Sequence, residues 1–156
     1  MELWSEVIRD GGRIPRTYTA DGDNISPPLH FSDLPKKARE LALILDDIQA
    51  DEPRHIHWIL YGIDPQRADL PEGILHEREP DAVPGVVQGT NSLGNVGYNG
   101  PQPPAAGPHR YRFRLIALDQ ATNLPPGATT EDLERAMEGH VIREAELRAT
   151  YERPRV

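Results

Sequence analysis

The chain has 156 residues, no cysteine and a formal net charge of -8 at pH 7. Disulfides and thiolate metal sites are therefore excluded, and nucleic acid is disfavoured as a partner because surfaces that bind it are basic. The length is that of one ordinary domain, so we expect residues 1–156 to form a single domain with its own core.

The sequence also bears on where the protein resides. The first residues, MELWSEVIRDGG, contain no apolar run of signal-peptide length, and no stretch long enough for a membrane-spanning helix occurs. We therefore expect a cytoplasmic protein without integral membrane association. The 16 prolines and 13 glycines form no low-complexity tract, which favours many turns between short strands.

The first half of the chain predicts strands separated by turn-rich segments. The stretch 18–28 (YTADGDNISPP) favours tight turns, and its two adjacent prolines exclude a helix. The run 40–45 (ELALIL) is continuously apolar, as in a buried central strand, although a helical turn would show the same pattern. The predicted strands cover 3–7, 29–31, 40–45 and 55–63, and residues 64–84 are expected to be mostly loop.

The second half predicts a short strand at 86–88, a loop over 91–107 and an alternating strand over 111–118 (YRFRLIAL). Thr129, followed by two acidic residues, predicts the start of a helix that ends at Gly139. Period-two alternation predicts a last strand over 141–152, in spite of the helical propensity of its EAELRA segment. Many short strands with one clear helix favour a mainly β fold, a β-sandwich.

Two polar segments lie at strand ends. Asp47 follows the 40–45 strand within DDIQAD (46–51); a solvated turn is the simpler interpretation, and a carboxylate aimed into a cleft is the alternative. His55 and His57 lie two residues apart and would face one side of a strand. They could bind a metal together with Asp47, but hydrogen-bonded histidines are commoner in strands, so we expect no metal.

The third segment is GYNGPQPP (97–104), which leads into His109 and Tyr111. Its prolines fix φ angles, and Gly97 and Gly100 allow close approach of the backbone. A stiff wall of this kind loses little entropy when it contacts a ligand, but a turn that only covers the core is an equally good interpretation. His109 and Tyr111 would point to one side of the strand start, beside that wall.

No motif indicates an enzyme class or a cofactor: GxSxG, P-loop, HExxH and dinucleotide-binding patterns are all missing. Ser92, His109 and Asp47 could be combined into a triad on paper, but triads are recognised by geometry.

These segments together resemble the phosphatidylethanolamine-binding protein family, also called Raf kinase inhibitor-like proteins, and its small bacterial branch. The resemblance rests on YTADGDNISPPL, LALILDD, HWILYGI, GTNSLGNVGYNGPQPP, HRYRFRLIALD and GHVIREAELRATYER, which span nearly the whole chain. It implies a Greek-key sandwich of two antiparallel sheets with few helices, and assembly as a homodimer.

The resemblance also implies a small pocket for phosphate-like anions at one end of the fold. Carried over by motif, its residues are Asp47, His57, Gly100, Pro101, His109 and Tyr111. Neutral His57 and His109 would each offer one N–H donor to the anion, and Tyr111 a hydroxyl.

The chain departs from the family pattern directly after Asp47. Where the family has Asp-Pro-Asp-x-Pro, this chain has Asp47-Ile48-Gln49-Ala50-Asp51, so Gln49 replaces an acid and both prolines are missing. A neutral amide can donate to a phosphate oxygen, which makes Gln49 a further candidate for ligand binding.

The function expected from these observations is capture of a small phosphorylated or anionic ligand, with regulation of a protein partner through the pocket as an extension; the sequence does not identify that partner. One alternative is a hydrolase of phosphate esters or acyl groups with His57 or His109 as general base. Another is a protease or kinase inhibitor acting through a mobile surface loop, for which 69–84 is the best candidate. No cofactor is expected.

Overall fold

The computed structural model describes residues 1–49, 54–103 and 107–154. Strands account for most of its regular structure, and the elements follow one another along the chain as β1 (Glu2–Trp4), β2 (Gly12–Arg13), the 3-10 helix η1 (Arg16–Tyr18), β3 (Leu29–Ser32), β4 (Glu40–Asp47), β5 (His55–Ile63), β6 (Asp69–Leu70), β7 (Val87–Gln88), β8 (His109–Leu118), α1 (Thr130–Met137) and β9 (Val141–Tyr151).

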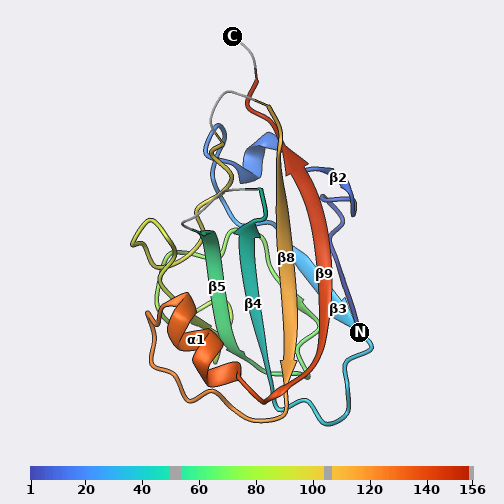
Figure 1. Ribbon diagram of the computed structural model, residues 1–156, viewed down its shortest axis with the longest axis vertical. Helices are drawn as coiled ribbons and strands as arrows, with labels where there is room; N and C mark the ends of the chain where they lie inside the picture. The colour runs from blue at the N-terminus through green and yellow to red at the C-terminus, as the bar shows by residue number, and fades with distance from the viewer. Residues whose placement is uncertain (50–53, 104–106, 155–156) are drawn as a thin grey trace.

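The strands form two sheets. The larger has the order β2-β9-β8-β4-β5-β7, and the smaller has the order β1-β3-β6. Figure 1 shows the larger sheet face on, with α1 in front of it and β3 behind. The prediction of a mainly β, two-sheet fold with few helices is confirmed. One pair departs from the expected antiparallel arrangement, because β2 runs parallel to β9.

The inner core fills the space between the two sheets. Leu41, Leu43 and Leu45 of β4 face it, and every second residue of β8 from Tyr111 onward does the same. The small sheet contributes residues such as Leu29 and Phe31. The alternation read from 111–118 therefore marks the inward face of β8 correctly.

A second, smaller core lies on the other face of the large sheet, under α1. Leu133 and Met137 of the helix pack there with Ile44 and Ile116. Thr129 caps the helix as predicted: its side chain accepts a hydrogen bond from the Asp132 N–H, and the Asp132 carboxylate accepts one from the Thr129 N–H. Since α1 covers part of this face, β4 and β5 are buried on both sides where it lies.

Several predicted boundaries differ from the structure. The first strand was predicted over 3–7 but ends at Trp4, because the Ser5 hydroxyl donates to Pro28 O and accepts from Val7 N, which turns the chain. Residues 64–84 include the two-residue strand β6, and β8 begins two residues before the predicted start, at His109.

The ends of three neighbouring strands meet at one end of the large sheet. In the order β8-β4-β5, the middle strand runs antiparallel to both neighbours. The end of β4 therefore lies beside the starts of β5 and β8, at the top of the view in Figure 1. This end of the sheet holds the polar residues singled out above.

Candidate functional site

The site is built around a hydrogen-bonded pair of side chains on neighbouring strands. Asp47 ends β4, His109 begins β8, and the His109 Nδ1 lies 2.6 Å from the Asp47 Oδ2. The Asp47 side chain is only 3% exposed and that of His109 is 21% exposed. Tyr111 pairs directly with Asp47 in the sheet register, so all three side chains come from adjacent positions.

A β-bulge brings His57 to the same place. Leu45 and Asp46 of β4 pair with Trp58 and Ile56 of β5, which leaves His57 as the extra residue between them. Across the bulge the strand changes face: Ile56 packs in the core under α1, whereas Trp58 packs in the inner core. Bulges re-aim side chains in this way, and here the result sets His57 edge-on against the Tyr111 ring, with centroids 5.5 Å apart.

The hydrogen bonding of His57 fixes its tautomer. Its Nδ1 lies 2.7 Å from the main-chain O of Asn99. A carbonyl oxygen can only accept, so Nδ1 carries the proton. Burial lowers the pKa of His57, against the opposing effects of the Asn99 hydrogen bond and the Asp47 charge.

The Tyr111 hydroxyl is buried and has no hydrogen-bond partner among the described residues. Burial raises the pKa of Tyr111, and the neighbouring Asp47 and Tyr151 raise it further, so the hydroxyl keeps its proton. An unpaired buried donor is unfavourable in the folded state, and polar groups of this kind call for an explanation.

Gly100 and Pro101 form a wall that is fastened to the turn at 18–24. The Gly100 N–H donates to Asn24 Oδ1 at 2.7 Å, and the Ala20 N–H donates to Pro101 O at 3.0 Å. A Cβ at position 100 would lie 2.2 Å from Tyr18 O, so only glycine fits there. The stiffness expected of this segment therefore comes from cross-links as well as from its prolines.

Gln49 contributes through its main chain. Its N–H donates to Asp47 Oδ1 at 2.9 Å, closing the turn after β4, while its side chain is exposed. Of the other residues in the DDIQAD segment, 50 and 51 lie outside the described residues.

A hollow of about 430 Å³, here called the polar hollow, opens beside these residues. Of the predicted site residues, His57 and Gly100 line it, and Asp47, Pro101, His109 and Tyr111 are not among its lining residues. The rest of the lining is Ala20, Asn24, Arg54, His55, Ile56, Ser92, Leu93, Asn99 and Gln102. Its volume is that of a pocket for a small organic molecule.

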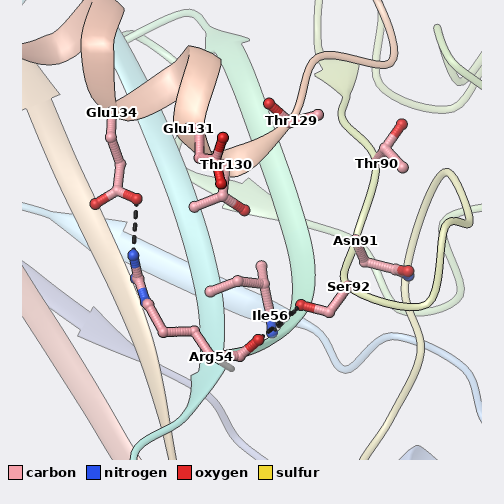
Figure 2. A pocket seen from close by; sticks show the side chains of 9 residues that line it. All are labelled: Arg54, Ile56, Thr90, Asn91, Ser92, Thr129, Thr130, Glu131 and Glu134. Atoms are coloured by element: carbon pink, nitrogen blue, oxygen red, sulfur yellow. Dashed lines mark hydrogen bonds and ion pairs between the residues drawn. The ribbon is translucent and has the colours of Figure 1, made fainter. Parts of the chain in front are cut away.

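A second hollow, of about 350 Å³, adjoins the first and shares Arg54, Ile56 and Ser92 with it. Figure 2 shows Arg54 reaching across it from the start of β5 to Glu134 on α1, with Thr129 and Thr130 at the start of the helix opposite Ser92. The Arg54 to Glu134 distance is 2.7 Å, so this hollow is closed at one side by an ion pair.

The predicted alternatives fare differently. Ser92 does not complete a triad, because its hydroxyl donates to Arg54 O and accepts from Ile56 N. No group of three or more His, Asp or Glu side chains able to hold a metal occurs within 1–49, 54–103 and 107–154. The expectation that each neutral histidine offers an N–H to an anion is wrong, since both Nδ1 protons are already used, by Asn99 O and by Asp47.

Sequence reasoning missed the residues that support the site. Asn91 is buried; its amide donates to Gly97 O and to Asn99 Oδ1, and its oxygen accepts from the N–H groups of Leu93 and Asn95. The asparagines clustered among glycines in TNSLGNVGYNG were the available signal, because such side chains bind nearby backbone in turns. The link from Asn99 O to His57 had no signal in the sequence.

The fold and this site define a mainly β protein of two packed sheets, with a polar cluster at one end of the larger sheet. A family model described as phosphatidylethanolamine-binding protein matches residues 4–152. The chain belongs to that family.

Similar proteins come from archaea and bacteria. A protein of Methanothermobacter thermautotrophicus is 48% identical over 98% of this chain and 99% of its own length, and one of Pyrococcus horikoshii is 43% identical over 96% and 75%, respectively; both carry the name UPF0098 protein. The sequence suggested a bacterial branch of the family, and these relatives show that similar proteins also occur in archaea.

Solved structures agree. A phosphatidylethanolamine-binding protein homologue from Chlamydia trachomatis superposes with a TM-score of 0.87 at 39% identity, covering 98% of this chain and 97% of that one. Escherichia coli YbcL, described as a member of the mammalian family, gives 0.90 at 25% identity, covering 98% of both chains. Among the described residues, no helix has the length and apolar character needed to cross a membrane.

Proposed function

We propose that this protein binds a small phosphorylated or otherwise anionic molecule at the end of the large sheet where the end of β4 meets the starts of β5 and β8. The observation that carries the proposal is the His109–Asp47 pair at 2.6 Å, set beside His57 and the unpaired buried hydroxyl of Tyr111. The name of the matching family, which refers to a phospholipid, points to the same ligand chemistry.

The donors of the site would come from the β8 residues. Since the His109 Nδ1 proton is directed at Asp47, its Nε2 donates to a ligand only when the ring is an imidazolium. The Asp47 carboxylate also holds the His109 ring in its orientation. The Tyr111 hydroxyl adds a neutral donor, so a single negative group could be held in spite of the overall charge of -8.

The experiment is thermal unfolding with increasing inorganic phosphate and phosphoethanolamine. Ligand at 100 times its dissociation constant adds about 2.7 kcal/mol of stability, and this gain should disappear in His109→Ala. His140→Ala is the matched control, because His140 also bonds through Nδ1 to a carboxylate, that of Asp119 beyond the other end of β8. Stabilisation that is equal in the wild type and in His109→Ala, or missing from the wild type, would contradict the proposal.

The binding proposal extends to regulation of a protein partner through the occupied site, and to a homodimeric, cytoplasmic protein. The inhibitor alternative has less support, because the segment 69–84 is anchored. Ile74 and Val83 are buried, the Gly73 N–H donates to Ser26 O, and the Gln88 amide donates to Leu75 O. Such anchors oppose the mobility that an inhibitory loop needs.

A further inference from the structure

The two imidazoles of the site share one property that restricts what they can bind. Each has its Nδ1 proton committed inside the protein, His57 to Asn99 O at 2.7 Å and His109 to Asp47 Oδ2 at 2.6 Å. A neutral imidazole has one N–H, so its remaining nitrogen is an acceptor. In their neutral forms both rings therefore present Nε2 as an acceptor.

The surroundings of His57 keep it in that form. From β4 it is faced by Asp47, from β8 by the Tyr111 ring, from its own strand by His55, and from the loop by the main chain of Asn99 and Gly100. Arg54 lines the same hollow. Burial lowers the pKa of His57 despite the Asp47 charge, so near neutral pH the ring is uncharged and its Nε2 is a permanent acceptor. Among the described residues the ring is hydrogen-bonded to the main chain of Asn99 and Gly100, and a main-chain carbonyl cannot donate to this nitrogen.

Resting on the proposed function, we propose that the His57 Nε2 accepts a hydrogen bond from a protonated oxygen of the bound anion. The site then selects a singly protonated phosphate or phosphate monoester over oxyanions that carry no proton. His57 is a specificity-determining residue, while His109 and Tyr111 supply the donors.

The arrangement matches the chemistry of a phosphate monoanion. Such a group has a P–OH to donate and further oxygens to accept, and the second pKa of a phosphate monoester is about 6, so the monoanion is available near neutral pH. Sulfate has the same tetrahedral shape but is fully deprotonated in this range. Against sulfate, the His57 Nε2 would meet an oxygen lone pair and stay unsatisfied, which is unfavourable for a buried polar group.

The test compares inorganic phosphate with sulfate by titration calorimetry on the full chain. At about pH 6 we expect phosphate to bind about 10- to 100-fold more tightly than sulfate, because an unmatched polar group at a binding site is strongly discriminated against. At about pH 8 the monoester phosphoethanolamine has mostly lost its last phosphate proton, so its binding must restore that proton, whereas inorganic phosphate still carries a P–OH as its dianion and serves as the reference. The binding enthalpies in two buffers of different ionisation enthalpy measure the proton taken up.

The informative variant is His57→Gln, whose amide can turn a donor toward the anion. We expect its preference for phosphate over sulfate to fall below about threefold, through tighter sulfate binding, and its proton uptake at about pH 8 to fall by about one proton per bound phosphoethanolamine. His140→Gln, which removes a histidine–aspartate pair remote from the site, should keep the wild-type preference. Far-ultraviolet circular dichroism of each variant checks that it is folded.

The outcomes separate the two proposals. Phosphate and sulfate binding equally well to the wild type would overturn the role of His57 and leave anion binding intact. An unchanged preference in folded His57→Gln would do the same. If neither anion binds at any pH, the proposed function falls and the role of His57 falls with it.

Discussion

Asp46 and Asp47 are consecutive residues that lie on opposite faces of β4, and different types of side chain contact their carboxylates. Their side chains are similarly buried, 8% and 3% exposed, and their partners Arg112 and His109 are 22% and 21% exposed. Asp46 is bound by two nitrogens of the Arg112 guanidinium, at 3.2 and 2.8 Å, with Arg54 3.8 Å away. Asp47 faces a histidine instead.

The difference separates a structural pair from a candidate binding pair. The hydrogen bonds of Asp46 raise the pKa of Arg112, a group that is charged at every physiological pH in any case. Histidine, by contrast, is the residue type whose side chain can both donate and accept through its two ring nitrogens. At equal burial, the chemistry of the partner decides whether a carboxylate fastens the sheet or equips it for binding.

The largest change in stability should come from replacing each of the two carboxylates in turn. We expect Asp46→Ala to lower the free energy of unfolding by about 2 kcal/mol, because a mostly buried guanidinium loses two hydrogen bonds and keeps the more distant Glu146, at 3.6 Å. Asp47→Ala should lower it by about 1 kcal/mol, the typical net contribution of a hydrogen bond, yet should abolish phosphate binding. Urea denaturation and calorimetry measure both quantities.

A second variant of the Asp46 pair serves as the control. Replacing both partners, Asp46→Leu with Arg112→Met, should recover part of the lost stability, because it also removes the guanidinium that has lost its hydrogen bonds. If Asp46→Ala were no less stable than Asp47→Ala, the distinction between the two carboxylates would not hold.

Tyr111→Phe sharpens the contrast on the binding face, with a smaller effect. Removing an unpaired buried hydroxyl should leave stability unchanged or raise it by about 1 kcal/mol, whereas phosphate affinity should fall about 5- to 10-fold. Thermal unfolding and calorimetry on the same samples give both numbers. A loss of stability with unchanged affinity would mean that the hydroxyl serves the core and not the ligand. Tyr98→Phe is the matched control. The buried Tyr98 hydroxyl donates to Tyr18 O, so its removal should lower stability and leave phosphate affinity unchanged.

The smallest effect is expected from pH. Burial holds the pKa of His57 in the folded protein below its ordinary value of 6.5, so between these two values the unfolded chain binds more protons. Stability should therefore fall as pH drops below 6.5 and stop falling below the folded pKa, with a slope from this residue of at most about 1.4 kcal/mol per pH unit. In His57→Gln, urea denaturation at several pH values should show a shallower decline. A parallel decline in the two proteins would contradict a neutral, buried His57.

Much of the fold could be predicted because its causes are local. Alternation placed Tyr111, Phe113 and Leu115 on the inward face of β8, and the Thr129 cap and its acidic neighbours gave the helix start. Both patterns follow from the geometry of a single strand or helix, which neighbouring residues determine. The same reasoning placed His109 and Tyr111 on one side of their strand, beside the proline-rich wall.

The tertiary structure decided what the sequence left open, namely which atoms of these residues are free. The bulge that turns His57, the approach of Gly100 to Tyr18 O and the bond from His57 to Asn99 O each join segments distant in sequence. Whether Asp46 or Asp47 meets the histidine likewise depended on strand register. A hydrogen bond depends on distances of a few tenths of an ångström between separate segments, and residue spacing along one chain does not specify them.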